Sequence, residues 1–357
     1  MQTTVEIDGS FGEGGGQIVR IALSLAAIVG KKVEVKNIRV KRPNPGLRPQ
    51  HLTALQAIAH ISGGVIEGLT VGSKRVTYSP GEALAKERID INVGTAGSIP
   101  LIIQCILPAL VFSKSRSVVK IVGGTDVKWS PTIDYVKHVF FPNLRMFGVK
   151  ADLAVVKRGY YPRGGGVVDL TVKPAKKLKS VNFVREKLEE IEVISVCSNL
   201  PRHVAERQAK SALNELRKKG IKSANVKIVV NPREKAVGRG TSILVKGVTE
   251  SNVVCGGDAI GERGKPAEKV GSEAALKFLE WYESKASVDI YLGDMLIPYA
   301  SLAQGETTYT VQKETGHIIS SLYVEERILG AKYRVKKIEE ELYRISINGV
   351  GFENKFI

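Results

Sequence analysis

A glycine-marked turn, an apolar helix and a β-rich stretch recur along this chain, and this recurrence constrains its fold more than any other feature. Gly14-Gly15-Gly16 precedes a predicted helix over 17–29 and a predicted strand over 33–40. The turn from Gly94 to Ser98 likewise precedes a predicted helix over 99–112 and another strand. Repeated units of two helices and a few strands predict a multi-lobed α+β architecture.

Two more stretches with this pattern follow. Gly123-Gly124 and then Ser130-Pro131 precede a predicted helix over 132–147, because serine caps a helix and proline suits its first position. Farther along, a predicted helix over 291–303 leads into a predicted strand over 307–313.

The pattern breaks after about residue 180, where a lysine-rich connector leads into a unit predicted as strand, helix, two strands and a closing helix. The chain has 357 residues, more than a single core usually holds. We therefore expect an inserted small α/β domain over 184–284, within a large domain formed by 1–183 and 285–357.

The charge balance favours a polyanionic partner. Lysine and arginine number 53 against 36 acidic residues, which gives a net charge of +17. Nucleic acid is the simplest partner for such a protein, although a basic protein with a merely solvated surface has the same totals.

The remaining bulk features predict a cytoplasmic protein. The apolar runs stay below the ~18 residues that a membrane-spanning helix needs, and the N-terminus has no basic flank before an apolar signal core. Cys105, Cys197 and Cys255 are widely spaced without metal-ligand spacing, so we expect reduced, mostly buried thiols.

The first fifty residues combine two devices that attract anions. Glycines between Gly9 and Gly16 let backbone N–H groups approach a ligand, and the following helix start favours negative charge. The loop after the next strand adds four cations, Arg39, Lys41, Arg42 and Arg48. A phosphate ligand is the favoured interpretation, and a solvated charge run is the weaker one. Glu13, the acid among the glycines, is placed to hold a divalent metal.

Polar residues on the first helix extend this hypothesis. Gln17, Arg20 and Ser24 share one face of an otherwise apolar helix, which favours a ligand-facing stripe, with pairing of Arg20 to an internal carboxylate as the alternative. Gln50 and His51 begin the next predicted helix at Pro49, and His51 should stay neutral among arginines.

Other candidates stay open on the residues alone. His317 is not separable from His51 or His203 as a catalytic residue, since a lone histidine is more often structural. The glycine cluster 164–166, after the Tyr160-Tyr161-Pro162-Arg163 run, is at least as well explained by a tight turn as by a role in binding.

Seven motifs, taken in chain order, carry a resemblance to a known family. They are the runs Asp8–Arg20, Ile38–His51, Gly94–Ser98, Gly123–Asp126, Tyr161–Gly166, Pro201–Glu206 and Gly316-His317. On these motifs the chain resembles RNA 3′-terminal phosphate cyclase over essentially its whole length.

The resemblance implies an ATP-dependent reaction whose partner is RNA with a 3′-terminal phosphate. In the family a histidine attacks the α-phosphorus of ATP, the histidine-linked AMP passes to the RNA 3′-phosphate to give RNA(3′)pp(5′)A, and the 2′-OH displaces AMP to leave a 2′,3′-cyclic phosphate. His317 matches the nucleophile. Such covalent catalysis divides one displacement into easier steps.

The resemblance also implies the binding residues. Glu13 matches a residue that approaches a divalent metal, Mg²⁺ or Mn²⁺. The phosphate and RNA positions are Arg20, Arg39, Arg42, Gln50 and His51. The nucleotide positions are Gln104, Pro131, Tyr291, Leu292, Gly293, Asp294 and Met295. Pro131 and Tyr291 match the residues that sandwich adenine, whereas Met295 stands where some relatives carry glutamine.

The implied fold is three repeated βαβαββ-like units, similar to enolpyruvyl transferases, with a small inserted α/β domain of thioredoxin-like topology. A homodimer is compatible with these expectations. One alternative is a cyclase-like ribosome-assembly protein that binds RNA without adenylylation, but such relatives lack the histidine that His317 matches. Another alternative, an enolpyruvyl transferase, gives no reason for a net charge of +17.

Overall fold

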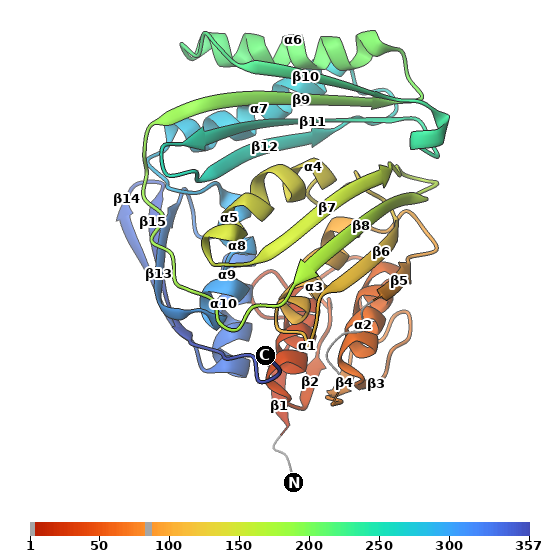
Figure 1. Ribbon diagram of the computed structural model, residues 1–357, viewed down its shortest axis with the longest axis vertical. Helices are drawn as coiled ribbons and strands as arrows, with labels where there is room; N and C mark the ends of the chain where they lie inside the picture. Colours follow the sequence, from red (N-terminus) through yellow and green to blue (C-terminus); the bar gives the residue numbers. More distant parts are fainter. Residues whose placement is uncertain (1–3, 83–87) are drawn as a thin grey trace.

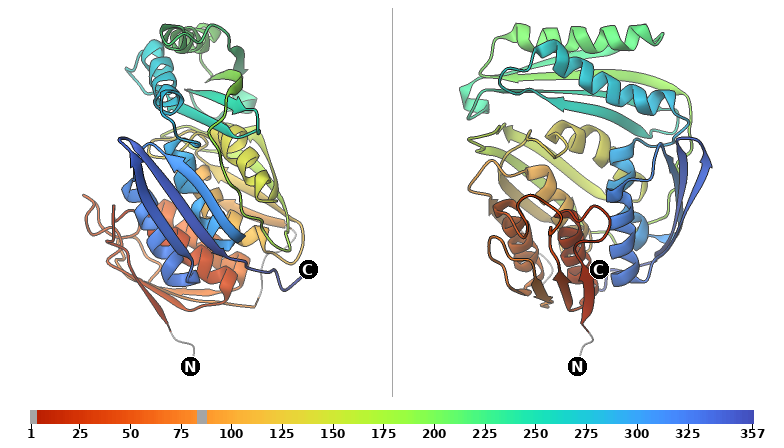
Figure 2. Two further views of the ribbon diagram at one scale, coloured as in Figure 1. Left: turned by 90° about the vertical axis from the view of Figure 1, so that its left-hand side faces the viewer. Right: turned by 180° about the vertical axis from the view of Figure 1, so that it is seen from behind.

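The structure is a computed structural model that describes residues 4–82 and 88–357. It stacks two parts along its longest axis (Figure 1). One part contains three small sheets with their helices, and the other is a single sheet with two helices (Figures 1 and 2). Within the described residues, no helix combines the length and apolar character needed to cross a bilayer.

The first unit alternates strands and helices before ending in two strands. Its elements are β1 (Val5–Asp8), α1 (Gln17–Val29), β2 (Val33–Lys36), α2 (Pro49–Ser62), β3 (Val65–Glu67) and β4 (Val76–Ser79). The strand order is β1-β2-β4-β3, with β1 and β2 parallel and the other pairs antiparallel. β2 ends four residues earlier than predicted, because Asn37 and Arg39 adopt positive φ angles and turn the chain into the basic loop.

The second unit repeats this topology. Its elements are β5 (Arg88–Asn92), α3 (Ile99–Val111), β6 (Ser117–Gly123), α4 (Ile133–Tyr135), the π-helical segment η1 (Val136–Phe140), α5 (Phe141–Met146), β7 (Lys150–Lys157) and β8 (Gly166–Lys173). The strand order is β5-β6-β8-β7, again with the first pair parallel and the others antiparallel.

The predicted helix over 132–147 forms, with two differences. Its cap is Thr132, whose hydroxyl accepts a hydrogen bond from the backbone N–H of Tyr135 at 3.2 Å, two residues later than predicted. Its middle turn, Val136–Phe140, is π-helical. Pro142 follows and has no N–H to give to the preceding turn, and the wider turn accommodates this loss.

The third unit begins before the inserted segment. Its elements are α8 (Ile290–Met295), α9 (Ile297–Leu302), β13 (Gln304–Val311), α10 (Gly316–Leu329), β14 (Lys332–Glu339) and β15 (Leu342–Val350). The sheet order is β13-β15-β14. Two isolated parallel bridges, Lys179 with Gln304 and Asn182 with Thr308, place 179–182 beside β13, where β1 and β5 lie in the other units. The three-unit prediction is confirmed.

The remaining sheet is built from the segment between those bridges and α8. Its elements are β9 (Leu188–Ser198), α6 (Arg202–Lys218), β10 (Asn225–Asn231), the 3₁₀ turn η2 (Arg233–Lys235), β11 (Gly240–Thr249), β12 (Val254–Ile260) and α7 (Ala267–Glu283). We call this sheet with its helices the insert. The order β10-β9-β11-β12, with only the β10–β9 pair parallel, agrees with the expected thioredoxin-like unit. The exact domain bounds stay a prediction.

The insert packs on the large part through one face of its sheet. α6 and α7 cover the other face and contact each other (Figure 2). Asn143 of α5 donates to the backbone carbonyl of Val254 in β12 at 2.7 Å, which ties the two parts together. In the large part, α1 is almost wholly buried between α2, α3 and α10, so residues at its N-terminus are held rigidly.

Candidate active site

The N-terminal turns of α1 and α10 lie side by side and bring the two ends of the chain together. Sequence reasoning did not predict α10. It begins at Gly316 because the Thr315 hydroxyl accepts from the backbone N–H of Ile318 at 3.1 Å and caps the helix. His317 therefore stands in the first turn of a helix, next to the glycine-rich entry to α1.

His317 is held from both sides by residues of that entry. Its Nε2 lies 2.8 Å from a carboxylate oxygen of Glu13, and its Nδ1 contacts the side-chain carbonyl of Gln17. The imidazole is still half exposed, at 51% of its side-chain surface. A histidine that is oriented by two partners and open to solvent is suited to nucleophilic chemistry.

The orientation of Gln17 determines which nitrogen of His317 carries a proton. The Gln17 amide donates to Asp294 at 2.6 Å and to the Ser321 hydroxyl at 2.7 Å, so its oxygen faces His317 as an acceptor. The Nδ1 of His317 is therefore the N–H donor, and in the neutral ring Nε2 carries the lone pair. Burial raises the pKa of the Asp294 carboxyl, while the nearby His317, Ser321 and Gln17 oppose that rise.

Arg20 is a buried cation without a side-chain partner among the described residues. Burial lowers the pKa of its guanidinium, and Asp294 is a nearby negative group that acts against this shift. The alternative that Arg20 pairs with an internal carboxylate is not realised within residues 4–82 and 88–357, where no ion pair forms to it. An unpaired buried guanidinium is costly unless an anion completes it.

Arg20 faces a narrow cavity of about 30 Å³. Gln104, Asp294 and Met295 line the same cavity. These three nucleotide-site candidates therefore come together with a phosphate-site candidate. Leu292 and Gly293 lie in the packing beneath: Leu292 is fully buried, and a Cβ on Gly293 would lie 2.5 Å from a Val311 methyl carbon.

The basic loop divides its cations between holding the loop and facing the site. Arg39 donates to the backbone carbonyls of Asn44 at 2.7 Å and Gly46 at 2.8 Å, and so fixes the loop. Arg42 pairs with the Glu13 carboxylate. Burial and the neighbouring cations Arg42 and Arg48 lower the pKa of Arg39. An anion bound here would relieve that mutual repulsion.

His51 lies beneath the glycine-rich run. Its Nδ1 accepts from the backbone N–H of Arg48 at 3.0 Å, so in the neutral ring Nε2 carries the proton. Burial, reinforced by Arg20, Arg39 and Arg48, lowers the pKa of His51 to about 3, in the direction that the expectation of a neutral ring requires. A Cβ on Gly16 would lie 2.2 Å from this Nε2, so only glycine allows the approach.

Gln50 lies at the edge of this group. A Cβ on Gly97 would lie 3.1 Å from the Gln50 Cβ, so the glycine turn of the second unit packs directly against it. The turn from Gly94 to Ser98 thereby closes one side of the phosphate region.

Tyr291 and Pro131 are joined through two residues of the insert. Lys277 of α7 lies 5.4 Å from the Tyr291 ring centroid and donates to the Asp258 backbone carbonyl at 2.7 Å. The carboxylate of Asp258 accepts from the backbone N–H of Thr132, next to Pro131, at 2.6 Å. Sequence reasoning missed Asp258 and Lys277, because nothing in the motif pattern links the insert to this site.

The residues present fit a divalent ion that is shared with a phosphate ligand. Among the described residues no three histidine, cysteine or acidic side chains cluster as a complete metal site. Mg²⁺ commonly takes only one or two carboxylates and completes its shell with phosphate oxygens and water. The Glu13 carboxylate, about one-third exposed, has the chemistry of such a single ligand.

The comparisons with known proteins identify one family. The RNA 3′-terminal phosphate cyclase family model matches residues 11–335. A protein of Staphylothermus marinus named RNA 3′-terminal phosphate cyclase is 47% identical and covers 97% of this chain and 98% of its own. A protein of Pyrococcus furiosus with the same name is 45% identical over 92% of this chain and 94% of its own.

Among solved structures, the enolpyruvyl transferase NikO from Streptomyces tendae matches with a TM-score of 0.38 and 13% identity. The match covers 98% of this chain and 49% of NikO. That likeness carries no argument about the site.

Proposed function

The chain belongs to the RNA 3′-terminal phosphate cyclase family, and on that premise we propose that it uses ATP to convert an RNA 3′-terminal phosphate into a 2′,3′-cyclic phosphate. We propose that the reaction passes through an intermediate in which AMP is bonded to His317. The observation that carries the proposal is the contact of His317 Nδ1 with the Gln17 carbonyl, which leaves Nε2 as the nucleophilic atom.

In the first step, the Nε2 lone pair of His317 attacks the α-phosphorus of ATP. The N–P bond forms as the bond from that phosphorus to the pyrophosphate oxygen breaks, and pyrophosphate leaves. Glu13 lies 2.8 Å from Nε2, close enough to remove a proton from a protonated ring before attack. Gln17 holds the Nδ1–H, which keeps the ring in line and stabilises the positive charge that develops on it.

The groups that would stabilise the negative charge of the phosphates are already oriented by the fold. The buried guanidinium of Arg20 and the N-terminal turn of α1 face the same region. When bound, a divalent ion on Glu13 would neutralise phosphate charge further. Because these groups are held rigidly, little reorganisation opposes the reaction.

In the second step, an oxygen of the RNA 3′-phosphate attacks the phosphorus of the adenylyl group, and the N–P bond to His317 breaks. The neighbouring 2′-OH then attacks the RNA phosphate, loses its proton and releases AMP, which closes the cyclic diester. Arg42 and Gln50 supply a cationic and an amide group for the terminal phosphate. Arg39 adds its positive charge from the loop that it fixes, and neutral His51 donates through Nε2–H.

Adenine is proposed to lie between Tyr291 and Pro131. Lys277 and Asp258 brace the two residues from the insert, so nucleotide binding should depend on both parts of the molecule. A homodimer and a cytoplasmic location stay predictions.

Incubation with ATP labelled at the α-phosphate tests the proposal. We expect an acid-labile AMP adduct in the unaltered protein, none in His317→Ala, and a normal amount in His203→Ala, which removes an exposed histidine at the start of α6. Cyclisation of a 3′-phosphorylated oligonucleotide should require the same residue. RNA binding should persist in His317→Ala. Absence of the adduct in the unaltered protein would instead favour an RNA-binding assembly factor.

A further inference from the structure

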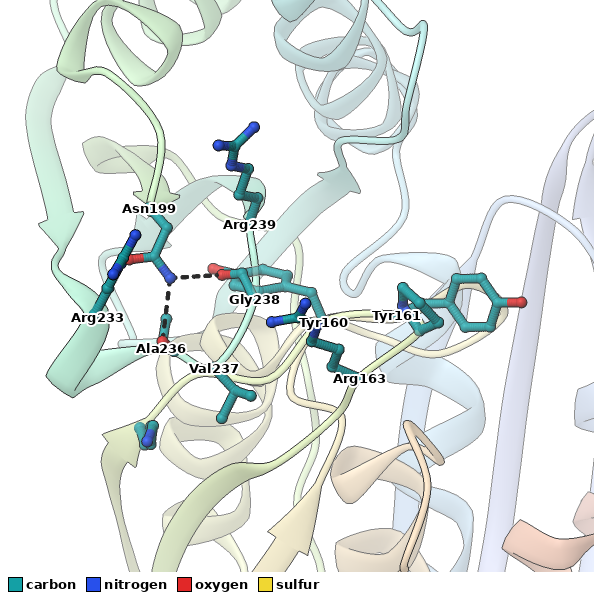
Figure 3. Close-up of a pocket in the computed structure, with 11 residues that line it drawn as sticks. Tyr160, Tyr161, Arg163, Asn199, Arg233, Ala236, Val237, Gly238 and Arg239 are labelled. Atoms are coloured by element: carbon teal, nitrogen blue, oxygen red, sulfur yellow. Dashed lines mark hydrogen bonds between the residues drawn. The ribbon is translucent and has the colours of Figure 1, made fainter.

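A second cavity, of about 940 Å³, lies where the turn between β7 and β8 meets the insert (Figure 3). Four cations line it, two from the large part and two from the insert. They are Lys157, Arg163, Arg233 and Arg239. None of the residues implied in catalysis lines this cavity.

These four cations are free of side-chain partners among the described residues. The structure records no ion pair and no side-chain hydrogen bond for any of them, and no aspartate or glutamate lines the cavity. Nearby cations differ: Lys128 pairs with Glu262, and Arg158 pairs with two buried aspartates. In Figure 3, Arg163, Arg233 and Arg239 come from different segments that border the cavity. Uncompensated positive charge of this kind attracts a polyanion.

The walls of the cavity are held by hydrogen bonds that cross between the two parts. The Tyr160 and Ser198 hydroxyls lie 2.8 Å apart, and the backbone N–H of Arg158 donates to the Lys235 carbonyl at 2.7 Å. Within the insert, the Asn199 amide donates to the carbonyls of Ala236 at 3.1 Å and Gly238 at 3.0 Å (Figure 3). The cavity is therefore preformed, which lowers the entropy cost of binding.

An exposed aromatic ring stands at the rim. Tyr161 is 81% exposed, and in Figure 3 its ring projects away from the other labelled side chains. An aromatic face beside a cationic groove is the arrangement by which proteins bind single-stranded nucleic acid without reading its sequence, because every base can stack.

The cavity is connected to the phosphate region through close backbone packing. A Cβ on Gly164 would lie 2.6 Å from the Thr95 carbonyl oxygen, and a Cβ on Gly97 would lie 3.1 Å from the Gln50 Cβ. The turn that carries Tyr161 and Arg163 thus rests on the loop that borders Gln50. An RNA strand whose 3′-terminal phosphate lies at Gln50 and His51 can continue over this loop into the cavity.

We infer that this cavity and the ring of Tyr161 bind the nucleotides that precede the RNA 3′-terminal phosphate. The cations contact successive backbone phosphates, and Tyr161 stacks on a base. Binding at the cavity is independent of the RNA sequence. The inference rests on the proposed function only for the direction in which the RNA strand runs.

Substrate length tests the inference. Arg163→Ala/Arg239→Ala and Tyr161→Ala would be compared with Arg217→Ala. Arg217 is an exposed cation in the last turn of α6 and does not line the cavity. For a 3′-phosphorylated RNA about ten nucleotides long, we expect the KM for cyclisation to rise about tenfold in both cavity variants. The KM for a 3′-phosphorylated dinucleotide and the rate of adduct formation from ATP alone should not change.

Fluorescence anisotropy of the same long RNA, measured across salt concentrations, adds a readout that needs no catalysis. The slope of log Kd against log salt should fall by about 1.4 in the double arginine variant, because two phosphate contacts are lost. Unchanged Kd and slope in both folded cavity variants would overturn the inference, as would equal losses for the long RNA and the dinucleotide. If the unaltered protein forms no AMP adduct, the proposed function fails, while the anisotropy result still decides RNA binding at this cavity.

Discussion

The Nε2 of His317 lies 2.8 Å from a carboxylate oxygen of Glu13, although the two residues stand near opposite ends of the chain. Glu13 also pairs with Arg42, so one carboxylate connects the proposed nucleophile to the basic loop. Under the proposed function, this carboxylate accepts a proton from the ring and holds a metal ion together with the phosphates.

Glu13→Gln should lower the rate of His317 adenylylation about 100-fold, since the amide keeps the shape of the side chain but loses its charge and its capacity to accept a proton. The Mg²⁺ or Mn²⁺ concentration at which the adenylylation rate saturates should also be higher in this variant. Single-turnover labelling across a metal titration measures both effects. If Glu13→Gln shows the same metal dependence as the original protein, Glu13 is not a metal ligand. As a control, EDTA should stop the reaction of the original protein.

Gln17→Ala should slow adenylylation about 10- to 100-fold while the KM for ATP changes little. Gln17 contacts the ring and fixes the position of its proton, and loss of such orienting partners typically has effects of this size. Gln56→Ala, which removes an exposed glutamine of α2, is the matched control. A change confined to the KM for ATP would assign Gln17 to nucleotide binding instead.

Arg20→Met should stabilise the ligand-free protein and weaken ATP binding. Burial lowers the pKa of this guanidinium, and no partner among the described residues offsets the cost. An apolar side chain of similar size removes that cost, so we expect the Tm to rise by about 2 °C and the Kd for ATP to increase at least about tenfold. Calorimetry with and without ATP measures both, and Arg217→Met should change neither. A lower Tm in Arg20→Met would mean that an internal partner stabilises the charge.

His51 should remain neutral throughout the range from pH 5 to pH 8. Its pKa in the folded protein is about 3, against 6.5 for an ordinary histidine, so only the unfolded chain gains a proton as the pH falls below 6.5. His51 therefore contributes stability above pH 6.5 that declines between pH 6.5 and pH 3, by at most about 1.4 kcal/mol per pH unit.

Two measurements check this behaviour. The His51 ring-proton chemical shift should not titrate between pH 5 and pH 8. Urea unfolding should show the stability advantage of the unaltered protein over His51→Gln shrinking from pH 7.5 to pH 5.5. An inflection of the ring shift near pH 6.5 would contradict a buried neutral ring.

Local features of the sequence were sufficient for much of the fold. The helix predicted over 17–29 has those bounds in the structure, because its apolar residues and the glycines at both ends define it locally. The start of α2 at Pro49 and the unusual neutrality of His51 also followed from neighbouring residues.

Long-range contacts decided what the sequence left open. α10 was missed, because it begins with a glycine, a weak helix former, and its stability depends on packing against α1 and α9. The edge segment at 179–182 was missed for a similar reason, since its bridges to β13 span the whole insert.

By itself, the sequence determined the repeated α+β architecture. It also predicted a phosphate site in the first fifty residues and, through the family motifs, the histidine to examine. Only the tertiary structure decided which nitrogen of His317 carries the lone pair in the neutral ring, because Asp294 and Ser321 orient Gln17 from two other helices. It also decided that Arg20 has no partner among the described residues and that the cavity by Tyr161 adjoins the site. The physical reason is that hydrogen-bond direction and desolvation depend on groups distant in sequence, which local patterns do not encode.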